Sequence, residues 1–213
     1  MSDALIRTEM QIPGYGVSFR EQMVGRLTFG VTDPVAGYDD VGAVPFTLKG
    51  SIDIPDIEAF VADPTHSGGL AGQLYAPRAG FVLPGKSGIF RLFSPSGDPS
   101  VTWMVYELSY ERDGKPYYFA GRKEVRVGPV WRLWYETTTL FVRLHEGDAS
   151  GPIVAAGILR LNIFDLLALL GTFHATGYAR LSQALRAIGG FAWFFIRELW
   201  RTYIVRRPLV KTP

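Results

Sequence analysis

One stretch, Val101–Gly147, decides the fold of this protein, and it reads VTWMVYELSYERDGKPYYFAGRKEVRVGPVWRLWYETTTLFVRLHEG. Within it, residues 112–115 place an Asp-Gly turn between two runs rich in aromatic and β-branched residues, which is a strong signal for a β-hairpin. A two-residue loop puts Tyr110 opposite Tyr117 on one face of the hairpin. Further apolar residues continue that face, namely Met104, Tyr106, Leu108 and Phe119. We therefore predict that this face packs in the core.

The opposite face of the hairpin carries charged side chains among aromatic rings. Its residues are Trp103, Val105, Glu107, Ser109, Tyr118, Ala120, Arg122 and Glu124. A third run, Thr137–His145, alternates in the same way and adds Thr137, Thr139, Phe141, Arg143 and His145. Antiparallel sheets often expose one face to water. Alternatively, this face lines a closed barrel in which a few polar groups orient an apolar ligand. A register slip of one residue would exchange the two faces.

Eight candidate strands punctuated by Gly and Pro predict a mainly β fold. They span Gln22–Val31, Val44–Ile54, Gly69–Ala76, Gly88–Ser94, Thr102–Arg112, Tyr117–Val127, Tyr135–Leu144 and Ile153–Leu161. Such spacing is typical of an antiparallel up-and-down barrel, as in lipocalins, or of a sandwich. We favour the barrel for residues 1–162, interrupted by a short helix over Pro55–Ala62. We expect residues 163–213 to form a helical extension packed on it.

The extension contains a short apolar helix over Phe164–Leu170, then a longer helix. The longer helix has an apolar stripe at steps of three or four, expected to pack on the barrel: Leu181, Leu185, Ile188, Ala192, Phe195, Leu199 and Tyr203. Other aromatic and basic residues lie off this stripe, and we group them as a candidate membrane or partner surface: Arg186, Phe191, Trp193, Phe194, Arg197, Trp200 and Arg201.

Tryptophan interleaved with arginine is typical of helices that lie in a membrane surface. The longest uncharged run, Ala187–Ile196, has ten residues and is too short to span a bilayer. A protein partner, or a second copy of this chain, accounts for the same residues equally well. Burial within the chain is a third, less favoured alternative. Nucleic acid is disfavoured, because the cations alternate with bulky apolar groups.

Charge and composition indicate where in the cell the protein acts and which sites it lacks. The 213 residues carry a formal charge of +2, but the segment Gly177–Pro213 alone carries +6. The absence of cysteine excludes disulfides and thiolate sites. Asp3, Arg7 and Glu9 interrupt the region where a signal peptide would be apolar. We therefore expect a cytoplasmic protein, either free or peripheral to the inner face of the membrane.

Short motifs in the sequence predict no nucleotide, metal or cofactor site. Gly80–Ser87, GFVLPGKS, matches the P-loop pattern, but the residues after it resemble a strand and not the required helix. The three histidines, His66, His145 and His174, lack the spacing of a metal-binding pair, so we expect no metal. No GxSxG or strand-following GxGxxG pattern is present, and we expect no cofactor.

Four phrases resemble a region that accompanies bacterial cholesterol-oxidase-like members of the glucose-methanol-choline oxidoreductases. They are LFSPSGDP (Leu92–Pro99), MVYELSYERDGKPYYFAGRKEVR (Met104–Arg126), LWYETTTLFVRLHEG (Leu133–Gly147) and ELWRTY (Glu198–Tyr203). The resemblance covers about Phe19 to Tyr203. In that family a separate Rossmann part holds the flavin, and this chain lacks its glycine-rich fingerprint. The resemblance implies an association with the oxidation of sterol-like or other lipidic substrates, and a flavin oxidoreductase as a partner.

These observations lead to three hypotheses. The first is a barrel that binds a hydrophobic molecule, with a ligand lining that comprises Trp103, Glu107, Tyr118, Arg122, Thr139, Phe141 and Arg143. The second is a cofactor-independent isomerase or cyclase in which Glu107, Glu124 or His145 moves a proton. The third is an interaction domain in which the polar face of the hairpin is exposed to solvent.

Overall fold

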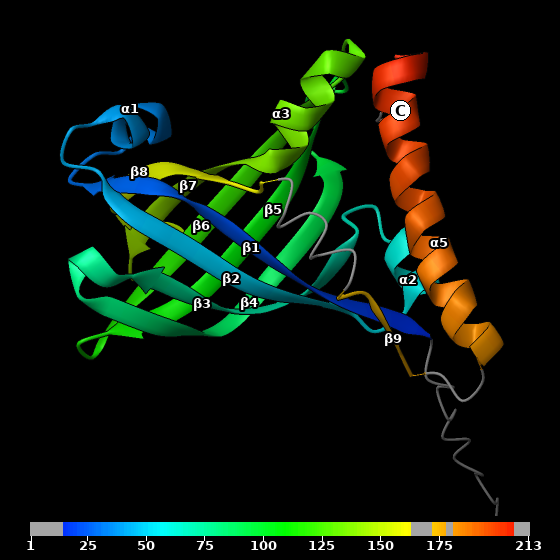
Figure 1. The fold of residues 1–213 in the computed structure, drawn as a ribbon, viewed down its shortest axis with the longest axis horizontal. Coiled ribbons are helices and arrows are strands. Elements are labelled where there is room, and N and C mark those ends of the chain that lie inside the picture. The colour runs from blue at the N-terminus through cyan, green and yellow to red at the C-terminus, as the bar shows by residue number, and fades with distance from the viewer. Residues whose placement is uncertain (1–14, 163–171, 178–180, 207–213) are drawn as a thin grey trace, which may run out of the picture.

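The computed structural model describes residues 15–162, 172–177 and 181–206, and within these an eight-stranded antiparallel barrel is closed (Figure 1). The strands are β1 (Gly16–Phe29), β2 (Val44–Ile54), β3 (Ser67–Ala76), β4 (Phe81–Pro95), β5 (Val101–Arg112), β6 (Lys115–Arg126), β7 (Thr139–Glu146) and β8 (Ile153–Arg160). Each strand pairs with the next along the chain, and β8 pairs with β1 to close the ring. The predicted up-and-down barrel is confirmed.

The hairpin register is also as predicted. Arg112 pairs with Lys115, and Tyr110 pairs with Tyr117, without a slip along β5 and β6. Asp113 and Gly114 have φ angles of 52° and 74°, so both turn residues occupy the left-handed region that an Asp-Gly turn tolerates. The aromatic rings of Tyr110 and Tyr117 stack with their centroids 5.6 Å apart.

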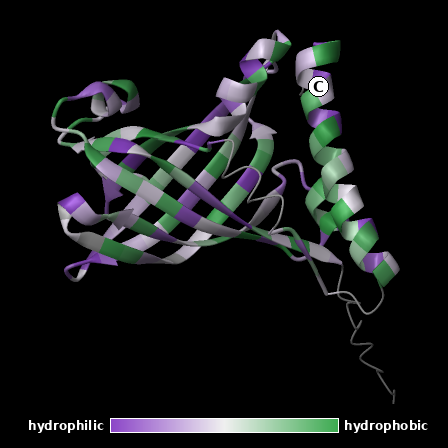
Figure 2. Cartoon of the chain, in the orientation of Figure 1, coloured by the Kyte–Doolittle hydropathy of each residue, from purple (hydrophilic) through white to green (hydrophobic). Residues whose placement is uncertain are grey.

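Apolar residues fill most of the barrel interior. Inward positions alternate along every strand, which Figure 2 shows as bands of changing hydropathy. Fully buried side chains from several strands meet there, including Met23, Leu27, Phe46, Leu48, Leu74, Leu108, Phe119 and Leu140. Eight strands enclose just enough room for such side chains. This part of the barrel is therefore a packed core.

Helices lie at the two ends of the barrel. α1 (Pro34–Asp39) packs against β8, and α2 (Ile57–Ala62) begins after Asp56, whose side chain accepts hydrogen bonds from two amides of its first turn. The 3₁₀ turns η1 (Pro77–Ala79) and η2 (Val130–Arg132) precede β4 and α3 (Leu133–Thr138). The short α2 was expected, but α1 was not. The start of the predicted strand Tyr135–Leu144 is wrong, because residues 133–138 form α3 and β7 begins at Thr139.

The helix α5 (Leu181–Trp200) crosses the end of the barrel near α3 and continues into a π-helical turn, η3 (Arg201–Val205) (Figure 1). Before it, β9 (His174–Thr176) adds to β1. The predicted helix over 164–170 lies outside the described residues. Among the described residues, no helix is both long and apolar enough to cross a bilayer.

The face that α5 buries differs from the predicted stripe. Phe191 and Phe194, which we had placed off the stripe, are buried in the core, whereas Leu181 and Leu185 are 73% and 65% exposed. Apolar residues lie on the exposed side of the helix as well as on its buried side, among them Leu185 and Trp193, so periodicity alone does not select the packed side. The barrel end selects it, because Phe191 and Phe194 meet the ring of Phe60 from α2.

Candidate functional site

A cavity of about 450 Å³ lies at the barrel end beneath α5. Strands β1, β4, β5 and β6 form its floor, α3 forms one wall, and α5 covers it. Its exposed lining residues are Trp134, Ala192 and Ile196, so the cavity opens between α3 and α5. The predicted barrel thus has a cavity at its mouth, beyond the packed core.

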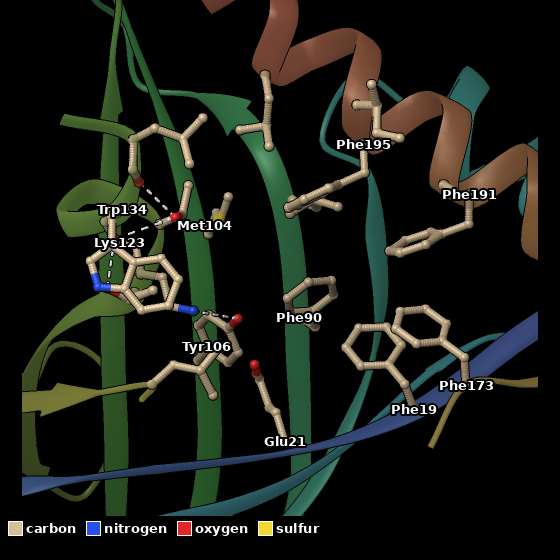
Figure 3. Close-up of a pocket in the computed structure, with 18 of the residues that line it drawn as sticks. Phe19, Glu21, Phe90, Met104, Tyr106, Lys123, Trp134, Phe173, Phe191 and Phe195 are labelled. Carbon is tan, nitrogen blue, oxygen red and sulfur yellow. Dashed lines mark hydrogen bonds between the residues drawn. The ribbon is translucent and has the colours of Figure 1, made fainter. Parts of the chain in front are cut away.

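Phenylalanine rings form one side of the cavity. Phe19 stacks on Phe173 with ring centroids 4.7 Å apart, and Phe191 of α5 lies 5.7 Å from Phe19. Phe90 and Phe195 complete this aromatic side, which Figure 3 shows facing the polar end of the cavity. Such a surface favours the apolar part of a ligand.

Three polar side chains gather at the other end of the cavity (Figure 3). Glu21 from β1, Tyr106 from β5 and Lys123 from β6 are exposed by 7%, 3% and 2%. The Lys123 Nζ donates a hydrogen bond of 3.1 Å to the Tyr106 hydroxyl. Glu21 Oε1 is buried and accepts no hydrogen bond from any described residue. We call these residues the polar trio.

Burial and charge together shift two members of the polar trio. Burial raises the pKa of Tyr106 well above its usual value, and the negative charge of Glu21 adds to the rise. Burial lowers the pKa of Lys123, and the charge of Glu21 partly opposes that effect. The opposite charges of Lys123 and Glu21 therefore favour each other inside an apolar cavity.

A buried contact holds the C-terminal end of α5 near α3. The Tyr203 hydroxyl of η3 donates a hydrogen bond of 2.7 Å to Glu136 Oε2 of α3. The same oxygen accepts a bond of 2.8 Å from the Arg126 amide, and Arg132 pairs with the other carboxylate oxygen at 3.0 Å. The helix that covers the cavity is thus joined to the helix that forms its wall.

Exposed apolar side chains lie on the elements that flank the opening of the cavity, namely η2, α3 and α5. Trp131 and Trp134 on the α3 side are 77% and 44% exposed, and Trp193 and Trp200 on α5 are 67% and 57% exposed. Ile196 lies between the last two along the helix and is 57% exposed. We call these five residues the mouth surface. It contains four of the five tryptophans of the chain.

The predicted ligand lining lies on the outer face of the barrel. Arg122 covers the ring of Trp103 at 3.7 Å, and Glu107 pairs with Arg91 at 3.2 Å. Arg143 Nε donates to the carbonyl of Thr32 at 3.3 Å. Three further residues of the predicted lining, Tyr118, Thr139 and Phe141, also line no described cavity. Barrel closure turned the more apolar face inward, because most interior positions must be dry.

The predicted acid and base residues are outside the cavity as well. Glu124 pairs with Arg126, and Glu107 is held by Arg91. His145 Nδ1 donates a hydrogen bond of 2.9 Å to the carbonyl oxygen of Gly151. The structure does not bring these three residues together with the polar trio.

The predicted membrane or partner residues are divided by the packing of α5. Trp193 and Trp200 belong to the mouth surface, but Phe194 is only 2% exposed. Arg186 pairs with Glu58 of α2 at 3.2 Å. The two other arginines of this group, Arg197 and Arg201, both pair with Glu198. This part of the sequence therefore contributes both to the core and to the surface.

Sequence reasoning missed Glu21 and Lys123. A signal for Lys123 was present, because it shares the inward face of β6 with Tyr117, Phe119 and Val125, where a cation is unexpected. Glu21 was missed because the predicted first strand began one residue after it. The P-loop match lies in the start of β4 and leads into no helix, as expected. The further expectation of a loop between strands is wrong there, because residues 81–87 belong to β4.

Comparisons with known proteins found no matching family model, no matching curated protein and no matching solved structure. Within the described ranges, no group of three or more histidine, aspartate or glutamate side chains is arranged to hold a metal ion. The geometry of the cavity is therefore the basis for assigning a function.

Proposed function

We propose that this protein binds an apolar small molecule, sterol-like or otherwise lipidic, in the cavity at the barrel mouth. One observation carries the proposal: the cavity is almost entirely apolar, yet Glu21, Tyr106 and Lys123 converge at one end of it. Ligand sites commonly combine an apolar lining of this size with a few polar groups that fix orientation. The apolar body of the ligand packs on the phenylalanine side, and its polar group meets the trio.

The resemblance to a region of cholesterol-oxidase-like enzymes supports a sterol-like ligand. In this proposal the chain holds or delivers a molecule that a flavin oxidoreductase partner oxidises. The redox chemistry belongs to that partner, since the resemblance includes no flavin-binding part.

A cavity-filling variant tests the proposal. We expect the apolar dye N-phenyl-1-naphthylamine to fluoresce on binding the wild-type protein. Ala192→Trp fills the cavity opening and should weaken dye binding about tenfold or more, since packed sites resist added volume. The matched control Leu185→Trp changes an exposed α5 position outside the cavity and should bind the dye normally.

Mass spectrometry of the purified protein under native conditions provides an independent readout. We expect a co-purifying apolar molecule that is released by organic extraction. A protein that purifies without such a molecule and also binds no dye would overturn the proposal.

A second candidate function is proton transfer within an apolar substrate. It is favoured by the polar trio, in which a buried carboxylate lies beside two hydrogen-bond donors. Glu21 would accept a proton from the α-carbon of an unsaturated ketone while Tyr106 and Lys123 stabilise the oxyanion that develops. Glu21 would then return that proton to the γ-carbon, which moves the double bond into conjugation with the carbonyl. This assignment replaces Glu107, Glu124 and His145, which lie outside the cavity. An apolar β,γ-unsaturated ketone should be isomerised by the wild type and bound without turnover by Glu21→Gln; an inactive wild type contradicts this candidate.

The mouth surface contacts a lipid bilayer in our proposal, so that ligand enters directly from the membrane. Its tryptophans suit the interfacial region, and α5 supplies cations nearby, including Arg197 and Arg201. Vesicles that contain brominated phospholipid quench tryptophan that enters the bilayer. We expect strong quenching in Trp103→Phe, which retains the four mouth tryptophans. Quenching should be lost when those four are replaced by Phe and only Trp103, on the barrel wall, remains. Equal quenching in the two variants would contradict lipid contact and favour a protein partner or a second copy.

A further inference from the structure

The polar trio offers a ligand three hydrogen-bonding groups with nearly compensating charge. Lys123 Nζ has three N–H donors and uses one of them on the Tyr106 hydroxyl. Glu21 contributes a carboxylate, which accepts hydrogen bonds and cannot donate them while ionised. All three side chains line the same cavity. A matching ligand group therefore has to suit a donor and an acceptor that lie in one small region.

Glu21 Oε1 is the group that points most directly to a ligand. It is buried, belongs to a side chain that is 7% exposed, and receives no hydrogen bond among the described residues. Figure 3 shows the Glu21 side chain directed from β1 toward Tyr106 and the cavity. Buried acceptors without donors are rare in folded proteins, because their lost hydration is not compensated. A ligand that donates a hydrogen bond to Oε1 would provide that compensation.

The charges of the trio exclude several classes of ligand group. A carboxylate would be repelled by Glu21, and an ammonium group would be repelled by Lys123. A ketone or an ether accepts a bond from Lys123 but donates nothing to Glu21. A hydroxyl group does both, because it has one donor and two acceptor lone pairs.

We propose that the cavity recognises the hydroxyl group of an apolar alcohol, whose O–H donates to Glu21 Oε1 and whose oxygen accepts from Lys123 Nζ. This inference rests on the proposed binding function and names the class of its ligand. Sterols and long-chain alcohols share this chemistry. Their hydroxyl group lies at one end of an apolar body, just as the polar trio lies at one end of an apolar cavity.

Matched probes test the hydroxyl group alone. Dodecan-1-ol, 1-methoxydodecane and dodecanoate are titrated against protein that carries N-phenyl-1-naphthylamine, and dye displacement is measured. We expect dodecan-1-ol to displace the dye at a concentration about tenfold lower than 1-methoxydodecane, which cannot donate a hydrogen bond to Glu21. The extra methyl group of the ether strengthens its apolar binding, so the comparison is weighted against the proposal. Dodecanoate should also bind more weakly than the alcohol.

A charge-neutral double variant assigns the preference to the trio. Glu21→Met/Lys123→Met removes both charges with side chains of similar length, and buried opposite charges can often be replaced together by apolar side chains. We expect this variant to bind the dye but to lose most of its preference for the alcohol. The control Arg91→Met/Glu107→Met removes an ion pair on the outer barrel face and should keep the wild-type preference. Circular dichroism verifies that each variant is folded.

The outcomes separate the inference from the function on which it rests. If the wild type binds the alcohol and the ether equally, hydroxyl recognition is wrong while apolar binding stands. If the double variant keeps the full preference, the trio is not the recognition site. If the wild type binds neither the dye nor the probes, the binding function and this inference both fail.

Discussion

The two faces of the β5–β6 hairpin place similar groups in different surroundings. On the outer face, the Arg122 guanidinium covers the ring of Trp103, and both groups reach solvent. On the inner face, Lys123 lies 4.9 Å from the ring centre of Tyr106, and both side chains are buried. Water screens the outer charge, whereas the inner charge loses its hydration and depends on Glu21 and Tyr106. The same pairing of cation and ring is thus ordinary outside and is a candidate site inside.

The largest expected difference between the faces concerns packing. Phe119 is fully buried, and its ring lies 6.4 Å from that of Phe46. Phe119→Ala should lower the free energy of unfolding by about 3–5 kcal/mol, because it leaves a cavity in the core. Its outer-face neighbour Tyr118→Ala should cost about 1 kcal/mol, as most substitutions do. Urea denaturation measures both values, and similar losses would show that the faces are not energetically distinct.

Removing one inner charge should have the next largest effect. Glu21→Leu leaves Lys123 buried without its carboxylate and should lower the free energy of unfolding by about 3 kcal/mol at neutral pH. On the outer face, Glu107→Leu leaves Arg91 in contact with water and should cost at most about 1 kcal/mol. Urea unfolding at low and high salt checks the comparison, since only the outer pair should respond to screening. An equally small loss for Glu21→Leu would mean that Lys123 is compensated by another group.

The buried tyrosine predicts a dependence on alkaline pH. The pKa of Tyr106 in the folded protein lies above that of the unfolded chain, which is about 10. Tyr106 therefore stabilises the fold fully below pH 10, and this contribution is lost as the pH rises above 10. Tyr106→Phe should make the fall in stability between pH 10 and 11 less steep by about one proton, or about 1.4 kcal/mol per pH unit.

The wild type and Tyr106→Phe both retain Lys123 and Glu21, so these two residues do not contribute to the difference between the two slopes. On the outer face, partial burial and the charge of Glu107 raise the pKa of Tyr118 to about 12. Tyr118→Phe should therefore act in the same direction, and its contribution should end near pH 12. Urea unfolding at a series of pH values measures the slopes; parallel curves for wild type and Tyr106→Phe would contradict the prediction.

The smallest expected effect belongs to the outer cation and ring. Arg122→Met removes a partly solvated contact with Trp103 and should cost about 0.5–1 kcal/mol. The fluorescence of Trp103 should change while the binding of N-phenyl-1-naphthylamine does not, because Arg122 lines no part of the cavity. Loss of dye binding in this variant would contradict the prediction and indicate that the ligand binds on the outer face.

Local signals in the sequence determined much of the barrel. The Asp-Gly turn set the pairing of β5 and β6, because such a turn admits few hairpin geometries. Strand β2 was predicted with its observed bounds, since turn residues delimit an alternating run there. The short helix α3 was missed, because its threonines and aromatics resemble a strand and tertiary contacts override that preference.

The location of the candidate site depended on contacts between distant parts of the chain. Alternation defined two faces of the hairpin and predicted that the more apolar face packs in the core, but it left open whether the polar face lines a ligand cavity or meets water. Ring closure through β1 and β8 decided that, and it brought Glu21 to Tyr106 and Lys123 from strands far apart in sequence. The packing of α5 then covered this end of the barrel. Register is a local property of a turn, whereas a cavity exists only where several elements meet, and for this reason only the tertiary structure revealed the polar trio.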